Sequence, residues 1–128
     1  MKIEVSVGEI VDKVSILEIK LEKVVDTDKL VNIRKEYSLL EADMKSLGVN
    51  TDSTDFIELK KVNLEIWNVE DAIRLKEVDK NFDEGFVQLA RDVYFKNDRR
   101  AALKRKINNK HGSLIIEEKE YTDYGQDS

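Results

Sequence analysis

The sequence predicts a mainly α fold: an antiparallel four-helix bundle with a small two-stranded antiparallel ribbon that joins the N- and C-terminal strands. The 128 residues include no proline and only five glycines, which favours long, unbroken helices. Apolar residues recur at helical spacing through four long segments, and only the two ends carry short strand patterns. We expect one helical-bundle domain, residues 1–121, followed by a disordered tail, residues 122–128.

The N-terminal segment predicts a strand followed by the first helix. Ile3, Val5 and Val7 alternate with polar residues, as in a half-buried strand. Ser6 and Glu9 have the spacing of a capping box, which predicts that a helix begins there. The apolar stripe of this helix is Ile10, Val14, Leu17, Leu21 and Val24.

The second helix has the most regular pattern in the chain. Asp26 or Thr27 caps its start, and Gly48 is its natural end. The turn before it is short, so the first two helices should form an antiparallel hairpin. Its apolar seam, with spacings of three and four residues, is Leu30, Ile33, Tyr37, Leu40, Met44 and Leu47.

Two longer helices and a second strand follow. Ser53 or Thr54 caps the third helix, which runs to about Lys80. Asp83 caps the fourth, which runs to about Lys110. The stretch "SLIIEEKEY" then reads as a strand. In an up-down-up-down bundle this strand begins near the end of the N-terminal strand, which predicts the ribbon.

Composition narrows the class of protein. The chain has no cysteine, which excludes disulfides and thiolate metal sites. No apolar run approaches the roughly 20 residues of a membrane span, so we expect a cytoplasmic protein without a membrane partner. The net charge of −5 argues against a nucleic-acid partner. His111 is the only histidine, so a histidine metal site has no support, and the pattern identifies no cofactor.

Polar residues occupy unexpected positions on the third helix. Asn63, Glu70 and Arg74 project within about 20° of one direction, near the centre of the apolar arc. Trp67 belongs to this arc, and Asp71 lies at its edge.

The fourth helix repeats the pattern, with Asn97, Arg100 and Lys104 on its apolar stripe. The first helix gives a smaller example, with Asp12 beside its apolar face. If the third and fourth helices are antiparallel, residues 63–74 lie opposite roughly 90–101, so the polar sets should share one groove.

Three hypotheses follow for these residues. The first is a site for a small anionic ligand, where Arg74, Arg100 and Lys104 hold the anion. Asn63 and Asn97 would orient it, Glu70 would position Arg74, and Trp67 would form a wall. The candidate ligand-binding residues are Asn63, Trp67, Glu70, Asp71, Arg74, Asn97, Arg100 and Lys104.

The second hypothesis is an interaction or structural module in which the inner polar residues only fix helix register. The third is a metal-dependent nucleotide hydrolase that uses helix carboxylates. If the protein is an enzyme, we expect Glu70 or Asp71 to be its acid or base. Whether the protein is an enzyme stays open. Ile16 and Ile19 lie off the first helix's main stripe, and with the seam of the second helix they favour a homodimer.

Four segments together resemble one protein family: "GEIVDKVSILEIKLEK", "NLEIWNVEDAIR", "FVQLARDVYFKNDRRAALKRKIN" and "GSLIIEEKEY". It is a small bacterial and phage family classed as a domain of unknown function. The resemblance covers nearly the whole chain and implies no activity. It implies recurring positions at Gly8, Glu9, Asp12, Lys13, Asn63, Trp67, Glu70, Asp71, Arg74, Arg91, Asn97 and Arg100.

Overall fold

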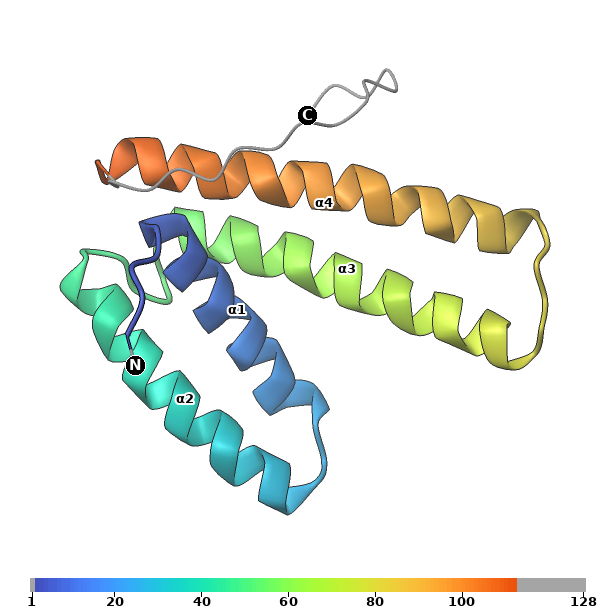
Figure 1. The fold of residues 1–128 in the computed structure, drawn as a ribbon, viewed down its shortest axis with the longest axis horizontal. Helices are drawn as coiled ribbons and strands as arrows, with labels where there is room; N and C mark the ends of the chain where they lie inside the picture. Colours follow the sequence, from blue (N-terminus) through green and yellow to red (C-terminus); the bar gives the residue numbers. More distant parts are fainter. Residues whose placement is uncertain (1, 113–128) are drawn as a thin grey trace.

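The computed structural model describes residues 2–112, and this part of the chain folds into four helices (Figure 1). The helices are α1 (Val7–Lys23), α2 (Thr27–Ser46), α3 (Thr54–Val78) and α4 (Glu84–Lys110). The mainly α fold and its four helices are therefore confirmed.

The helix ends follow the predicted capping chemistry. The side chains of Ser6, Asp26 and Asp83 accept hydrogen bonds from backbone N–H groups in the first turns of α1, α2 and α4. Ser53 occupies the N-cap of α3, but its hydroxyl accepts from the backbone N–H of Asn50 and makes no capping hydrogen bond to the helix. Gly48, which follows α2, has a φ of 87°, a conformation that glycine adopts without a steric penalty.

The prediction of a strand at residues 3–7 is wrong. Residues 2–6 form neither helix nor strand, and Val7 is the first residue of α1. Ser6 is extended because it caps the helix, and a run this short needs a hydrogen-bonded partner to persist as a strand. The predicted partner strand and the tail at 122–128 lie outside the described residues, so the ribbon has no support.

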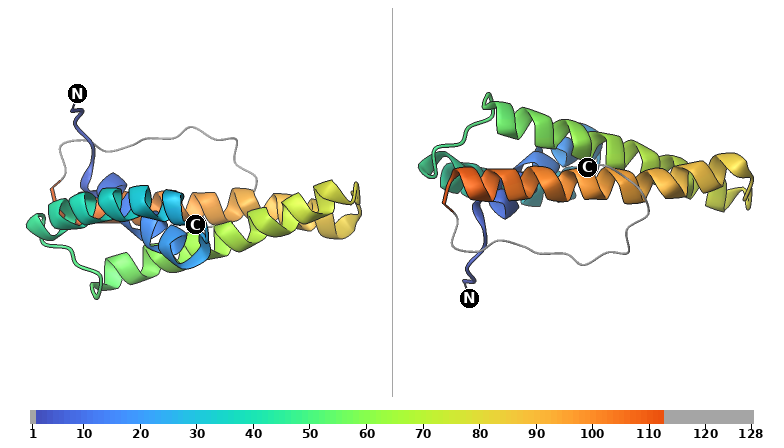
Figure 2. Two further views of the ribbon diagram at one scale, coloured as in Figure 1. Left: turned by 90° about the horizontal axis from the view of Figure 1, so that it is seen from below. Right: turned by 90° about the horizontal axis from the view of Figure 1, so that it is seen from above.

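The helices are arranged as two hairpins with α1 at the centre. α1 packs against α2, α3 and α4, whereas the backbone of α2 approaches that of α1 alone among the described helices. In a regular four-helix bundle each helix borders two others, so this arrangement is less symmetric than predicted. Figures 1 and 2 show the shorter α1–α2 hairpin lying over one end of the longer α3–α4 hairpin.

The hydrophobic core lies where the hairpins meet. It is formed by Val11, Val14, Met44, Val49, Phe56, Leu59 and Ile107. The apolar seam of α2 packs against this core through Tyr37 and Leu40. Ile19 is only 1% exposed because α1 has neighbours on several sides. The interpretation of Ile19 as an outward dimer residue is therefore wrong.

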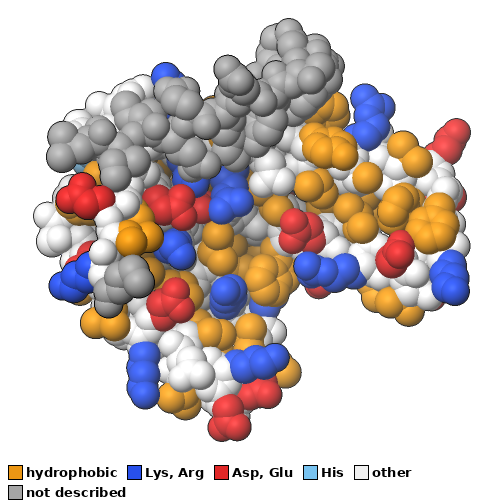
Figure 3. Space-filling model, viewed as in Figure 1, with side chains coloured by type: hydrophobic (Ala, Val, Ile, Leu, Met, Phe, Trp, Pro, Cys, Tyr) orange, Lys and Arg blue, Asp and Glu red, His pale blue; other side chains and the backbone are white. Residues whose placement is uncertain are grey.

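The far half of the α3–α4 hairpin projects beyond the core, and we call residues 67–97 the arm (Figure 1). No residue of the arm is buried. Figure 3 shows hydrophobic side chains gathered over this region. None of the described helices combines the length and apolar character needed to cross a membrane.

Candidate functional site

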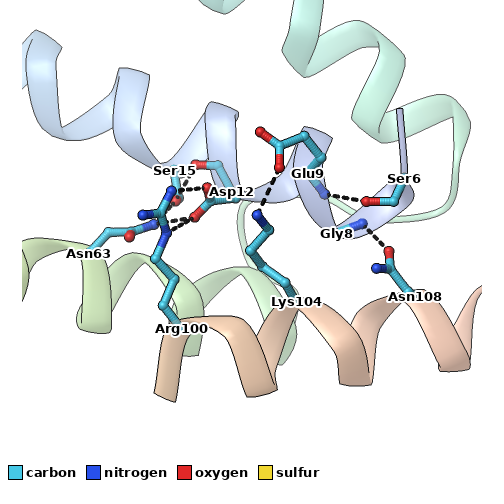
Figure 4. Close-up of polar contacts among 9 residues, drawn as sticks. All are labelled: Ser6, Gly8, Glu9, Asp12, Ser15, Asn63, Arg100, Lys104 and Asn108. Atoms are coloured by element: carbon cyan, nitrogen blue, oxygen red, sulfur yellow. Dashed lines mark hydrogen bonds and ion pairs between the residues drawn. The ribbon is translucent and has the colours of Figure 1, made fainter. Parts of the chain in front are cut away.

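Asp12 is the centre of a polar cluster where α1 meets α3 and α4 (Figure 4). Its carboxylate is only 1% exposed. Arg100 of α4 binds both carboxylate oxygens: Nε donates to Oδ1 at 2.9 Å and Nη2 donates to Oδ2. Such a two-pronged ion pair offsets part of the cost of removing both charges from water.

Asn63 of α3 completes the coordination of Asp12. Its Nδ2 donates to Asp12 Oδ1 at 2.9 Å and to the hydroxyl of Ser15 at 2.8 Å. Ser15 in turn donates to the backbone carbonyl of Asp12 at 2.7 Å. Within residues 2–112 every buried side-chain nitrogen and oxygen has a hydrogen-bond partner. One carboxylate thus ties three helices together.

A second set of contacts fixes the start of α1 against α4. Lys104, which is 8% exposed, donates to Glu9 Oε2 at 2.7 Å. Ser6 accepts from the Glu9 backbone N–H as the capping box predicts, but the Glu9 carboxylate turns to Lys104. The backbone N–H of Gly8 donates to Asn108 Oδ1 at 2.7 Å. An unpaired N–H of the first helical turn is thereby satisfied by another helix.

Gly8 also permits the close approach of α1 and α4. A Cβ at this position would lie 2.5 Å from the backbone carbonyl oxygen of Lys104, which no real side chain tolerates. We call the region around Gly8, Asp12 and their partners the junction. It comprises Ser6, Gly8, Glu9, Asp12, Ser15, Asn63, Arg100, Lys104 and Asn108 (Figure 4).

Ion pairs between α3 and α4 confirm the predicted register. Lys96 lies 3.4 Å from Glu65, and Lys110 lies 3.0 Å from Asp55. Residues 63–74 therefore face roughly 90–101.

The eight candidate residues divide into two groups along this register. Asn63, Arg100 and Lys104 belong to the junction, where each contacts a residue of α1. The other five lie on the arm: Trp67, Glu70, Asp71, Arg74 and Asn97.

Arg74 is far from the two cations of the junction. It lies level with about residue 90 of α4, and the ten residues from there to Arg100 span about 15 Å of helix. Arg74 and Asp71 are exposed, whereas Trp67, Glu70 and Asn97 are partly buried. No ion pair joins Glu70 to Arg74, although they are one turn apart.

Sequence reasoning missed the part played by α1. It placed the polar groove between α3 and α4 alone, whereas Asp12 and Glu9 of α1 meet the polar side chains of both helices. The available signal was Asp12 itself, which shares the buried face of α1 with Gly8 and Ser15 at helical spacing.

The model of a protein family of unknown function, DUF6165, matches residues 1–125. The chain belongs to this family. Membership of DUF6165 confirms that the chain is a member of a family of unknown function and assigns the chain no activity, while the bacterial and phage origin stays a prediction. Neither the curated proteins nor the solved structures include a match to it.

A second polar network of the DUF6165 chain links α1, α2 and α3. Lys60 donates to Glu18 at 2.7 Å and to Glu22 at 2.8 Å, and the Tyr37 hydroxyl donates to Glu18 at 3.0 Å. Burial and hydrogen bonds to Glu41 and Glu18 raise the pKa of Tyr37 well above its ordinary value of 10.0. Burial opposes the charge on Lys60, but its two carboxylate partners outweigh this and raise its pKa.

A polar cleft of about 220 Å³ opens beside the junction. Three cationic and three acidic side chains line it: Lys13, Lys20, Arg100, Glu9, Asp12 and Glu36. Its charges balance, so the cleft has no positive excess that would select an anion. Within the described residues no three His, Cys, Asp or Glu side chains are grouped to hold a metal ion.

Proposed function

We propose that this DUF6165 protein is a protein-interaction module that presents its arm to a helical partner. The observation that supports the proposal is that no residue of the arm is buried, although its helices carry apolar stripes. Leu75 is 68% exposed and Val78 is 78% exposed. Exposed apolar surface of this extent is typical of interaction sites.

Two helices alone cannot enclose their apolar stripes, because each stripe needs neighbours on more than one side. At the core end α1 supplies that neighbour for α3 and α4. Along the arm no described helix does so. Fully burying one large apolar side chain contributes about 1.5–3 kcal/mol, so a helix docked there would gain from several side chains at once.

The junction acts as the structural part of this module. Asp12 is satisfied by Asn63 and Arg100, and all three side chains come from different helices. Buried polar groups that are fully paired specify one packing arrangement, because any shift leaves a buried charge unpaired. The junction therefore fixes the direction in which the arm projects.

The anion-binding hypothesis remains the main competitor. In its favour, Lys13, Lys20 and Arg100 line one cleft. Against it, Arg100 and Asn63 already bind a carboxylate, that of Asp12, and Arg74 is too distant to share a small ligand with Arg100. The metal-dependent hydrolase lacks a grouped set of acidic ligands in residues 2–112.

Partner capture with matched variants tests the proposal. The arm variant is Leu75→Glu with Val78→Glu, and the control is Val25→Glu with Leu39→Glu, which changes exposed apolar residues of the α1–α2 hairpin. We expect a protein partner to bind wild type and control but not the arm variant, with all three equally helical by circular dichroism. A partner that the arm variant retains would overturn the proposal.

A thermal-shift measurement with inorganic phosphate, Mg²⁺ and Mn²⁺ separates the competing hypotheses. We expect no ligand to raise the melting temperature of the wild type. A rise with phosphate that is lost in Lys13→Ala would favour the anion site over the interaction module. A rise with a divalent metal would favour the hydrolase.

A further inference from the structure

We propose that the partner of the arm is a second copy of this chain, and that two arms form an intermolecular four-helix bundle. The inference rests on the proposed role of the arm as a docking surface. It goes further by naming the occupant and the residues that select it.

The docking face is the continuation of the groove that α1 fills at the junction. On α3, Asn63 faces α1, since it bonds to Asp12 and Ser15. Trp67, Glu70 and Arg74 follow Asn63 at spacings of four, three and four residues. Side chains at these spacings share one face of a helix. The three arm residues therefore line the same face beyond the region that α1 covers.

α4 supplies the other side of this face. Arg100 faces α1 through its bonds to Asp12. The residues that share its face along the arm, again at spacings of three and four, are Asn97, Val93, Ala90 and Phe86. All four are partly buried and none is fully buried. On α4 the combined face is apolar beyond Asn97, and on α3 it carries Glu70 and Arg74.

These two charges are complementary to a second copy of themselves. When two arms stack antiparallel about a two-fold axis level with residue 72, Glu70 of one copy lies opposite Arg74 of the other, and the reciprocal pair forms as well. A two-fold interface always repeats its contacts in this way. Within residues 2–112, Glu70 and Arg74 do not pair with each other, and charges on a docking face stabilise a complex only when they are paired.

The antiparallel arrangement also agrees with the shape of the molecule. The α1–α2 hairpin lies over the core end of the α3–α4 hairpin (Figures 1 and 2). Antiparallel arms place the two α1–α2 hairpins at opposite ends of the dimer, so they do not collide. Residues 67–78 of α3 span about 18 Å, and two arms of equal length overlap along their whole docking faces. Four helices then enclose the stripes that two leave open.

Sedimentation equilibrium of the full chain and its charge-reversal variants tests this proposal. We expect the wild type to be a dimer. Glu70→Arg alone places like charges opposite each other at both pairs, and so does Arg74→Glu. Each variant should raise the dissociation constant of the dimer by at least about tenfold. The control is Lys45→Glu, which reverses an exposed charge on α2, far from the arm, and should leave the dimer unchanged.

A mixture of the two arm variants provides the decisive measurement. The Glu70→Arg chain carries two cations on its docking face, and the Arg74→Glu chain carries two carboxylates. Mixed together they should form a heterodimer with both pairs restored, although neither chain dimerises well alone. A charge pair within one chain cannot produce this result.

Two results would overturn the homodimer. One is a wild type that stays monomeric at every concentration. The other is a dimer that neither charge reversal weakens, which would place the interface elsewhere. A monomer whose captured partner is still lost in the Leu75→Glu, Val78→Glu variant would overturn the homodimer alone and leave the interaction module standing. A monomer whose captured partner is retained by this variant would overturn both.

Discussion

The junction and the arm are built from the same two helices, yet their polar residues have opposite surroundings. At the junction Asn63 and Arg100 bind Asp12, which is almost wholly buried. On the arm, Glu70 and Arg74 occupy the same helix face and no residue is buried. The difference is α1, which covers one half of the α3–α4 groove. A polar residue on an apolar stripe is therefore a structural contact where a third helix supplies its partner, and it stays accessible where no third helix covers it.

Of the substitutions that test this contrast, the removal of the Asp12 carboxylate should lower the free energy of unfolding most. Asp12→Ala leaves the Arg100 guanidinium and the Asn63 amide without their carboxylate. Breaking a buried pair in this way typically destabilises by 3–5 kcal/mol. Arg100 keeps 29% exposure, so we expect a loss of about 3 kcal/mol, measured as a lower midpoint in urea unfolding.

The neighbouring substitution Lys13→Ala is the matched control, since Lys13 is exposed. Its effect should stay within about 0.5 kcal/mol. Equal midpoints for the two variants would mean that the junction contributes nothing to stability.

The sequence predicted the helices well because their signals are local. Caps such as Asp26 and Asp83 and the stop at Gly48 depend on residues a few positions away. The α3–α4 register was also predictable, since a short turn leaves two neighbouring helices little freedom.

The position of α1 could not be predicted in the same way. Its contacts with Asn63 and Arg100 join residues far apart in the chain, and their energies depend on which groups are buried together. The bundle assumption gave α1 two neighbouring helices and not the three that it has, so the polar residues of α3 and α4 were matched with each other. The N-terminal strand was mistaken because alternation over so few residues does not identify a pairing partner.

Substitutions at two glycines, one at the junction and one on the arm, compare how closely the two regions are packed, and their expected effects on stability are smaller. At Gly8, a Cβ would meet the backbone of Lys104 at 2.5 Å, so Gly8→Ala should separate α1 from α4 and cost about 1–3 kcal/mol. At Gly85 on the arm, a Cβ would meet only the ends of side chains, Asp83 Oδ1 at 3.2 Å and Lys76 Nζ at 3.3 Å, which can shift by a few tenths of an ångström. Gly85→Ala should therefore stabilise slightly, by about 0.5 kcal/mol. Thermal unfolding measures both, and a destabilisation at Gly85 as large as that at Gly8 would contradict the open character of the arm.

Alkaline pH should loosen the α1–α2–α3 packing rather than the arm. The folded state raises the pKa of Tyr37, so its contribution is complete below pH 10.0 and is lost as pH rises through the folded pKa. The raised pKa of Lys60 acts with the same sign.

Tyr37→Phe tests this pH dependence. It should remove a late step from the ultraviolet tyrosine titration and cost about 1 kcal/mol at neutral pH. A titration unchanged by the substitution would refute the assignment.

The smallest effect on overall stability should come from the cap of the arm, where Asp83 accepts from the backbone N–H of Phe86 and pairs with Lys76. Asp83→Ala removes both interactions. Because the arm has no buried residue, it should open without unfolding the core, so amides of residues 67–97 exchange hydrogen faster while the urea midpoint stays unchanged.

Asp26→Ala, which removes an equivalent cap from α2, is the control and should leave exchange in the arm unaltered. If Asp83→Ala instead speeds exchange throughout α1, the arm and the junction unfold as one unit. The two regions then differ in side-chain burial but not in local stability. If the effect is confined to the arm and disappears at higher protein concentration, a second copy of the chain supplies the cover that α1 supplies at the junction.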